Sequence, residues 1–309
     1  MAKSAELIEK VIAECSKIIV DKELQIKLSL ATFFAGGHIL IEDIPGVGKT
    51  TLAKTLSHVL GLDYARVQFT SDLLPSDILG VNYYDTKEAT FTFKRGPVFT
   101  QFLLADEINR ASSKTQSALL EAMEERYVTI DGKSIALPHP FFVIATKNPF
   151  EEIGTYELPS SQLDRFAISF SLGYPSAKAE REILKKAQKP SIESLDKLSN
   201  DELDSIFKAY QKIYLSDDIL DFIQEILNFT RQSGLYKVGL STRSALILVD
   251  IAKGWALIDG RDYVTPNDIN TILPYITYHR LVAIEGRKNA GEIADEILKN
   301  VHPDNPDRR

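Results

Sequence analysis

Cysteine is almost absent from this chain of 309 residues, in which Cys15 is the only example. One cysteine can form neither a disulfide framework nor a cysteine-ligated metal site, and such usage is typical of a reducing compartment. The five histidines are scattered without the spacing of metal ligands, which excludes a zinc motif. We therefore expect a cytoplasmic protein.

Long hydrophobic runs are also missing. Residues 1–20 mix Lys and Glu into an amphipathic pattern, whereas a signal peptide needs an unbroken apolar stretch. The apolar segment 245–258 is interrupted by Asp250 and Lys253, so it falls short of a membrane span. The sequence predicts neither a signal peptide nor a transmembrane helix.

Positive charge is in deficit. The chain has 36 Lys and Arg against 43 Asp and Glu, which gives a net charge of −7. This balance argues against a surface that coats nucleic acid. The remaining composition, 44% hydrophobic and 26% charged, is typical of globular proteins. At roughly 150 residues per domain, the length suggests about two domains.

The functional prediction starts from residues 38–60. Residues 38–41 form a short apolar run that predicts a buried strand, and a Pro/Gly turn follows it. The periodic apolar residues of 50–60 then predict a helix. Strand, glycine turn and helix in this order can cradle a phosphate group with backbone N–H groups at the start of the helix.

The residues of this turn have the types that phosphate binding needs. Gly46 and Gly48 let the chain curl, Lys49 adds a positive charge toward the β- and γ-phosphates, and the Thr50 hydroxyl can reach Mg²⁺. The phosphate-loop pattern has glycine where this chain has Asp43, whose carboxylate would have to point away from the ligand. A chance Gly/Pro turn followed by lysine is the alternative.

Polar residues follow further predicted strands at 64–69, 102–107, 141–146 and 167–172. The predicted helix 50–60 lies between the strands at 38–41 and 64–69, which implies that these two strands run parallel. Strand ends of a parallel sheet lie at the ligand-binding edge, where Asp106 can hold the Mg²⁺ hydration shell and Glu107 can deprotonate an attacking water. Asn148 could position that water, or it could be a turn asparagine before proline.

Two arginines are candidates for stabilising phosphoryl charge. Arg165 precedes the fifth strand and is a candidate arginine finger for a neighbouring subunit's nucleotide. Pairing with Asp164 or with a helix end is the alternative. Arg243 starts a helix and could swing over phosphate if the helical part of the chain folds down as a lid. Arg110 could reach a nucleotide across an interface or could be a plain surface residue.

Two hairpins and a change of composition complete the pattern. The alternation at 90–94 predicts one hairpin, and Asp131-Gly132 within 127–137 predicts another. Beyond residue 174 the strand patterns stop. Periodic helices are expected at about 177–188, 200–213, 216–233, 242–259, 266–278 and 290–299. The sequence thus predicts two domains, 1–173 and 174–309.

Taken together, five stretches resemble the MoxR family of AAA+ ATPases: 42–50, 104–111, 119–125, 145–149 and 162–166. The resemblance implies an α/β AAA+ P-loop core with a five-stranded parallel sheet and β-hairpin inserts, followed by a smaller all-α lid domain. It implies Asp106 and Glu107 as Walker B, Asn148 as first sensor, Arg165 as a finger acting in trans and Arg243 as second sensor on the lid. The Walker A loop would contact ATP through Asp43, Pro45, Gly46, Val47, Gly48, Lys49, Thr50 and Thr51.

The resemblance also implies what the protein does. It implies hydrolysis of ATP with Mg²⁺ between subunits of a ring, expected to be a hexamer, and chaperone-like action on protein clients through the hairpins. A partner with a von Willebrand A domain is implied as well. Ile19 and Val20 stand near the adenine, at positions where the family usually has a Gly-Gln pair.

Two other functions fit the same motifs. A nucleic-acid motor would use related inserts, although the acidic balance counts against it. A nucleotide-gated scaffold would use ATP only to control assembly. Stimulation of ATPase activity by DNA would favour the first, and absence of turnover would favour the second.

Overall fold

The computed structural model describes residues 2–149, 154–184, 190–286 and 288–301. Its centre is a parallel sheet with the strand order β2-β5-β8-β1-β9. The strands are β1 Ile39–Glu42, β2 Tyr64–Gln68, β5 Phe102–Asp106, β8 Phe142–Lys147 and β9 Ile168–Phe170. The predicted five-stranded parallel sheet is confirmed. The first two strands are parallel as expected, but β5 and β8 lie between them.

The sheet is covered on both faces, because its side chains alternate between two hydrophobic clusters. Ile39 and Ile41 of β1 belong to one cluster and Leu40 to the other. The first cluster packs against α1 Ala2–Ile18, α2 Glu23–Phe34 and α3 Lys49–Val59. The second packs against α5 Ser113–Glu125. Burial of the whole sheet leaves its strand ends as the places where polar groups gather.

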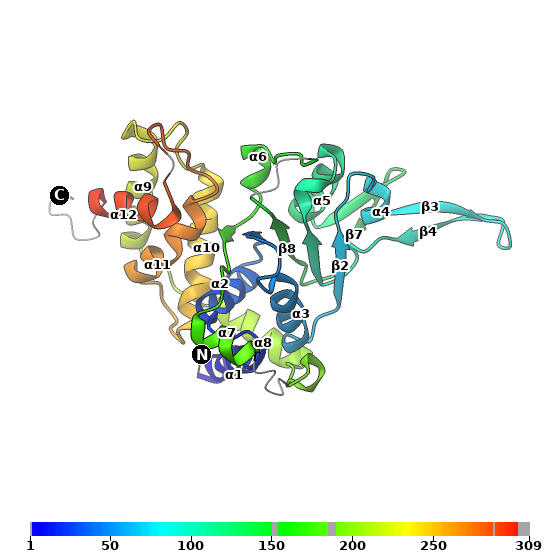
Figure 1. Ribbon diagram of the computed structural model, residues 1–309, viewed down its shortest axis with the longest axis horizontal. Coiled ribbons are helices and arrows are strands. Elements are labelled where there is room, and N and C mark those ends of the chain that lie inside the picture. The colour runs from blue at the N-terminus through cyan, green and yellow to red at the C-terminus, as the bar shows by residue number, and fades with distance from the viewer. Residues whose placement is uncertain (1, 150–153, 185–189, 287, 302–309) are drawn as a thin grey trace.

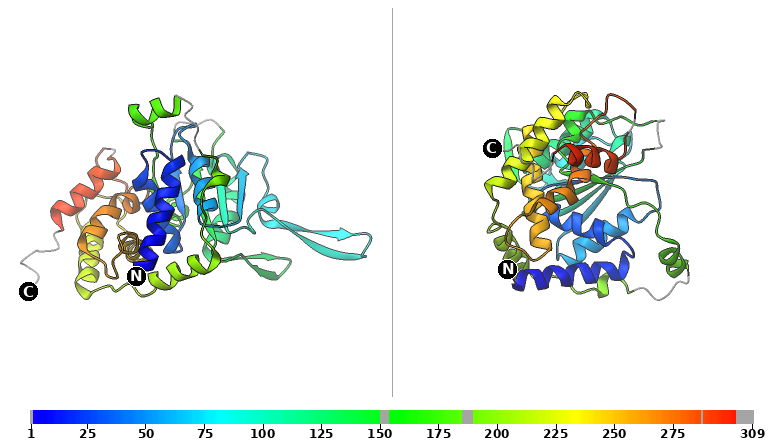
Figure 2. Two further views of the ribbon diagram at one scale, coloured as in Figure 1. Left: turned by 90° about the horizontal axis from the view of Figure 1, so that it is seen from below. Right: turned by 90° about the vertical axis from the view of Figure 1, so that its left-hand side faces the viewer.

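Two antiparallel hairpins extend from the second face, as predicted. The first is α4 Pro75–Leu79 with β3 Gly80–Asp85 and β4 Thr90–Arg95, and the second is β6 Tyr127–Ile130 with β7 Lys133–Ala136. Figures 1 and 2 show both hairpins leaving the body on the side away from the C-terminal helices. The Asn82 side chain donates to Asp131 at 2.6 Å, which ties the first hairpin to the turn of the second.

Beyond residue 174 the chain is helical, as predicted. Its helices are α7 Ala177–Leu184, α8 Asn200–Tyr210, α9 Asp217–Gln232, α10 Thr242–Ile258, α11 Pro266–Thr277 and α12 Ala290–Asn300. The short helix α6 Ser160–Leu163, before β9, was not expected from the sequence. Ser216 and Ser241 cap α9 and α10 through their hydroxyls. The end of the predicted helix 177–188 and the tail from residue 302 lie outside the described residues.

Helices α9–α12 form a bundle beside the sheet, at the left of Figure 1. The bundle approaches the core closely, since a Cβ on Gly254 of α10 would lie 2.4 Å from the carbonyl oxygen of Ala31 in α2. One hydrophobic cluster runs from the sheet through α2 into this bundle. The domain boundary at residue 173 therefore stays a prediction. Within the described ranges, no helix is both long and apolar enough to cross a membrane.

Candidate nucleotide-binding and catalytic site

The loop between β1 and α3 has the conformation that its glycines predict. Gly46 has a φ of 85° and Gly48 a φ of 95°, a left-handed region that L-residues with a Cβ seldom occupy. Gly48 is the N-cap of α3, and Leu52 N–H donates to its carbonyl at 2.9 Å. Because the first N–H groups of a helix have no acceptor within the helix, this end can receive an anion.

Lys49 and Asp43 set the charge of the loop. The Lys49 ammonium donates to the carbonyl oxygens of Asp43 and Ile44 at 2.7 and 2.8 Å, so it is folded back over the loop. The Asp43 carboxylate is buried and accepts from Ser171 Oγ at 3.0 Å and from Gly173 N–H at 2.7 Å. The carboxylate therefore points to the end of β9 and serves the fold there, away from the α3 N-terminus.

The other loop residues lie as their positions imply. Pro45 and Thr51 are exposed, while Val47 packs partly against the first hydrophobic cluster. Thr50 is the second residue of α3 and is half-buried. Ile19, by contrast, is only 8% exposed and belongs to the core between α1 and α2. Its side chain packs inside the protein, whereas Val20 is half-buried beside it.

Asp106 and Glu107 meet one buried hydroxyl at the end of β5. Thr146 Oγ1, on the neighbouring strand β8, donates to Asp106 Oδ1 at 2.6 Å and accepts from Glu107 N–H at 2.9 Å. Glu107 has a φ of 56° and a ψ of 51°, a conformation that non-glycine residues adopt at a cost. Thr146 thus holds both acidic residues at the strand end where the phosphate loop also lies.

Two residues of β2 that were not predicted as site residues contact this acidic pair. Arg66 forms an ion pair with Asp106 Oδ2 at 2.7 Å, and Gln68 Nε2 donates to Glu107 Oε2 at 2.7 Å. Arg110 pairs with the same Glu107 oxygen at 3.0 Å, within its own chain. The alternation of polar residues in a predicted strand was the available signal, but only the β2–β5 pairing shows what they face.

The residues at this edge fit a magnesium nucleotide. The Asp106 carboxylate and the Thr50 hydroxyl are oxygen donors of the kind that Mg²⁺ prefers, and both follow strands at the same end of the sheet. Asn148 directly follows β8 and is 8% exposed, so its amide belongs to the same edge. Lys49, Asp106, Glu107 and Asn148 therefore lie at one edge of the sheet, while their roles stay predictions.

Arg165 and Arg243 lie at the other end of the sheet. Both contact Glu124 of α5: Arg165 pairs with Oε2 at 3.2 Å and Arg243 with Oε1. Together with Gly37 and His38, which precede β1, they line a cavity of about 230 Å³. The phosphate loop follows the opposite end of β1, so these two arginines face away from their own loop.

Within its own subunit, Arg165 shows one alternative that the sequence left open, a contact with a helix end, because Glu124 lies in the last turn of α5. Its role as a finger for a neighbouring subunit stays a prediction. Arg165 does not pair with Asp164, because Asp164 binds Arg280 and Arg165 binds Glu124. Both arginines are partly exposed, at 29% and 45% of their side chains. Arg243 lies beside Arg165 before β1, so in this arrangement it is not over the phosphate loop of its own chain, and its role as second sensor stays a prediction.

His38 is part of the scaffold that holds this second cluster. Its Nδ1 accepts from Val143 N–H at 3.0 Å and its Nε2 lies 3.2 Å from the Met123 carbonyl oxygen. Complete burial, with a further contribution from the charge of Arg126, holds its pKa well below the usual value. His38 is therefore a neutral structural residue that joins β1, β8 and the end of α5.

Comparison with known proteins agrees with this geometry. Residues 38–168 match the family described as the ATPase family associated with various cellular activities (AAA), and residues 228–301 match the AAA lid domain. The chain is 43% identical to the uncharacterized protein YeaC of Bacillus subtilis, over 96% of this chain and 93% of YeaC. It is 38% identical to Chaperone MoxR1 of Mycobacterium tuberculosis, over 97% of this chain and 82% of that protein.

A solved structure has the same fold. A crystal structure of a protein from Cytophaga hutchinsonii superposes with a TM-score of 0.87 at 36% sequence identity, covering 97% of both chains. The match therefore extends over the sheet, the hairpins and the C-terminal helices together. With the phosphate loop, the acidic strand end and these relatives, the chain belongs to the MoxR family of AAA+ ATPases.

Proposed function

We propose that this protein hydrolyses ATP to ADP and phosphate at interfaces between copies of itself in a ring. The observation that carries the proposal is the separation of two groups of residues. Lys49, Asp106, Glu107 and Asn148 lie at one end of the sheet, and Arg165 and Arg243 lie at the other. The two groups are separated at least by the length of β1, whose four residues, at about 3.3 Å each, span about 13 Å.

A second copy would bring the two groups together. Arranged head to tail, as in a ring, each copy would place its arginine pair against the phosphate loop of the next. The two arginines are partly exposed at a cavity, so a neighbouring phosphate can compete with Glu124 for them. Guanidinium groups at this position would stabilise charge that develops on the transferred phosphoryl group.

The residues of the loop edge have complementary tasks in this proposal. Glu107 accepts a proton from the attacking water, Asn148 orients that water and Lys49 exchanges its two loop carbonyls for phosphate oxygens. Thr50 and Asp106 would hold Mg²⁺, which when bound neutralises charge on the phosphates. Glu107 must also exchange its contacts with Gln68 and Arg110 for the water.

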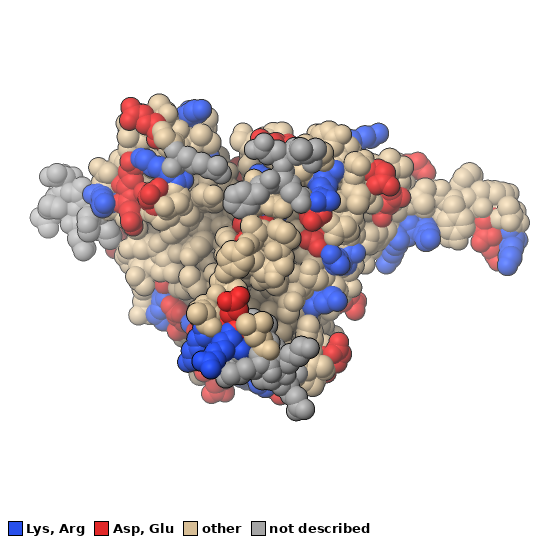
Figure 3. All heavy atoms as spheres, viewed as in Figure 1, with Lys and Arg blue, Asp and Glu red and all other residues tan. Residues whose placement is uncertain are grey.

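The hairpins are the proposed contact with a protein client, in the manner of a chaperone such as the M. tuberculosis relative. Tyr84 and Phe91 pack edge to face at 5.3 Å near the end of the first hairpin and are 52% and 72% exposed. Figure 3 shows this hairpin as a largely uncharged arm with charges at its tip. We also propose a partner with a von Willebrand A domain, and this part of the proposal is supported only by the resemblance to the family.

Two variants test the enzymatic part of the proposal. Lys49→Ala should lose nucleotide binding, and Glu107→Gln should bind ATP with near-normal affinity but hydrolyse it at least about 100-fold more slowly. Binding is measured with a fluorescent ATP analogue and turnover by phosphate release. Lys54→Ala, on the exposed face of α3, and Glu121→Gln, on the exposed face of α5, are the matched controls. Hydrolysis at the normal rate by Glu107→Gln would refute the assignment.

A further inference from the structure

Arg280 follows α11 and is one of the most completely engaged side chains of the helical bundle. Its side chain is 4% exposed although it carries a charge. All five of its N–H groups lie within hydrogen-bonding distance of acceptors. These acceptors are Asp164 Oδ1 at 2.7 Å, Ile276 O at 2.7 Å, Ala167 O at 3.0 Å, Phe166 O at 2.6 Å and Asp164 O at 3.2 Å, and His279 Nε2 also lies 2.7 Å from Nη1.

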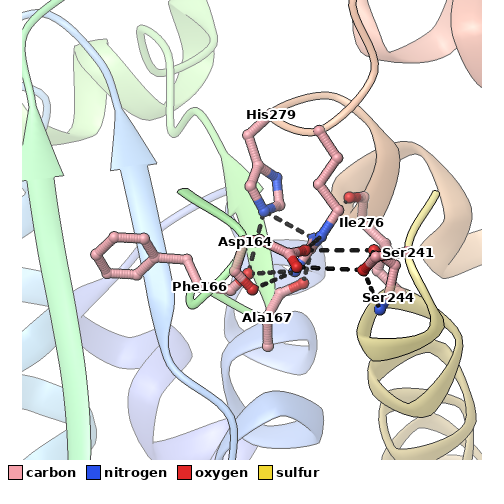
Figure 4. A network of polar contacts seen from close by, with 8 residues as sticks. Asp164, Phe166, Ala167, Ser241, Ser244, Ile276 and His279 are labelled. Atoms are coloured by element: carbon pink, nitrogen blue, oxygen red, sulfur yellow. Dashed lines mark hydrogen bonds and ion pairs between the residues drawn. The ribbon is translucent and has the colours of Figure 1, made fainter. Parts of the chain in front are cut away.

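Most of these acceptors belong to a single short segment. Asp164, Phe166 and Ala167 lie between α6 and β9, and the residue enclosed by them is Arg165. The guanidinium of Arg280 therefore clamps the backbone on both sides of the candidate finger. Figure 4 shows the dashed contacts converging on this segment from the helical bundle.

The Asp164 carboxylate extends the same cluster to the second arginine. It accepts from Ser241 Oγ at 3.2 Å and from Ser244 Oγ at 3.3 Å, in addition to Arg280. Ser241 is the N-cap of α10, and Arg243 is the second residue of that helix. One carboxylate thus connects the segment that carries Arg165 with the helix start that carries Arg243 (Figure 4).

The chemistry of this cluster favours a fixed geometry. A buried charge is costly unless it is paired and its hydrogen bonds are satisfied. The planar guanidinium satisfies its donors only when its acceptors stay where they are, and a lysine ammonium cannot reproduce that fork. A displacement of the 164–167 segment relative to α11 would break several of these bonds at once.

We propose that Arg280 and Asp164 are positioning residues that hold Arg165 and Arg243 as one rigid unit for the nucleotide of the neighbouring subunit. This inference rests on the proposed function, and it assigns the finger's position to the helical bundle as well as to the sheet. A movement of the bundle would carry both arginines together. Arg280 itself is buried beneath them and acts only through Arg165 and Arg243.

The test compares four purified proteins at concentrations where they assemble: Arg280→Lys, Arg165→Ala, the double variant and the unmodified chain. Arg280→Lys should lower kcat roughly 10- to 100-fold, since small misplacements of a stabilising group have effects of this size. Its affinity for a fluorescent ATP analogue should stay within about 2-fold, because its own phosphate loop lies at the other end of the sheet. The double variant should lose less activity than the product of the two single losses, because the part of the Arg280 effect that passes through Arg165 is already absent and only the part through Arg243 remains.

Arg261→Lys is the matched control. Arg261 also forms a fork with a buried carboxylate, that of Asp268, but this pair lies between α10 and α11, away from Asp164. Its replacement should leave kcat within about 2-fold. If Arg280→Lys does not fold, Asp164→Asn keeps the shape of the side chain and should show the same selective loss of kcat. Failure of both to fold would assign the cluster to stability alone and overturn the inference.

The panel separates this inference from the proposed function. A normal rate for Arg165→Ala would remove the finger, and the inference with it. Loss of activity in Arg165→Ala together with a normal rate in Arg280→Lys would overturn only the positioning role. Losses that multiply in the double variant, or a parallel loss of nucleotide affinity, would show that Arg280 acts on the whole fold.

Discussion

At the scale of single residues, the site depends on a hydroxyl that bridges two carboxylate residues. Thr146 is fully buried and links Asp106 to the backbone of Glu107 across neighbouring strands. Glu107 occupies a left-handed conformation, and the bond from its N–H to Thr146 helps to hold it there. The orientation of the proposed general base is therefore set partly by a residue that takes no part in proton transfer.

Thr146→Val keeps the shape of this side chain and removes its hydroxyl. The Glu107 N–H then loses its acceptor, and we expect a loss of about 1–3 kcal/mol in the free energy of unfolding. We also expect kcat to fall at least about 10-fold, because the Glu107 carboxylate loses its orientation. Urea denaturation and phosphate release measure the two effects.

Thr32→Val is the control for this change. Thr32 is equally buried, but its hydroxyl donates to Leu28 O within its own helix, α2. Its replacement should alter stability slightly and leave kcat unchanged. Equal kcat losses in both variants would show that Thr146 supports the fold in general and has no particular effect on Glu107.

Two buried histidines make stability depend on pH. His38 and His279 are completely buried and have a pKa well below the usual value of 6.5, because burial disfavours their charged forms. The unfolded chain therefore binds more protons than the folded chain below about pH 6.5. The free energy of unfolding should therefore stay constant with respect to these two groups above about pH 6.5. Below that pH it should decrease, by up to about 1.4 kcal/mol per pH unit for each histidine.

Urea denaturation at pH 7.5, 6.5 and 5.5 measures this slope, and His38→Gln isolates one contribution. The variant is expected to be less stable at pH 7.5 but to lose less stability on acidification. Identical pH slopes for the variant and the unmodified chain would contradict the role assigned to His38.

At the scale of helices and strands, the sequence was enough to predict most elements. It was not enough to predict which strands lie next to each other in the sheet. The apolar runs and turn residues were enough for β1, β5, β8 and both hairpins, since each signal is local. The order of strands is a property of the whole sheet. The parts played by Thr146, Arg66 and Gln68 follow from that order, so the sequence pattern alone did not indicate them.

The same distinction applies to the candidate site. The phosphate loop, Asp106, Glu107 and Asn148 follow strands directly, and their common edge follows from parallel pairing. The position of Arg243 depends on how α10 packs against α2, where Gly254 approaches Ala31. No local pattern reveals that contact, so the sequence could not indicate which end of the sheet Arg243 faces.

The first hairpin is an element that should be removable. Its base closes at two glycines: a Cβ on Gly96 would lie 2.6 Å from Gly80 N, so a short glycine linker can replace residues 81–95. The hairpin's large side chains, including Tyr83, Tyr84 and Phe91, are exposed and contribute little to the core. We expect the shortened protein to unfold within about 4 °C of the unmodified chain and to keep nucleotide binding.

Capture experiments complete this prediction. Immobilised Glu107→Gln protein should retain client proteins, and the same protein without residues 81–95 should retain fewer. Thermal unfolding and nucleotide binding serve as controls for the fold. A hairpin-less protein that captures the same proteins in the same amounts would show that clients bind elsewhere.

At the scale of the whole molecule, the proposed mechanism requires a second copy, because the residues assigned to one active site lie at opposite ends of the sheet. The phosphate-loop edge lacks a nearby Arg165 or Arg243 of its own, because Glu124 holds both at the far end of β1. In this proposal, association of copies completes the site. Turnover per chain should therefore rise with protein concentration until assembly is complete.

Mixing two inactive variants tests this account most directly. Glu107→Gln subunits lack the general base but can donate Arg165, and Arg165→Ala subunits lack the finger but keep Glu107. In a ring mixed one to one, about a quarter of the interfaces combine an intact Glu107 with an intact Arg165. We predict that the mixture recovers about a quarter of normal phosphate release, whereas a mixture no more active than the sum of its parts would contradict catalysis between subunits.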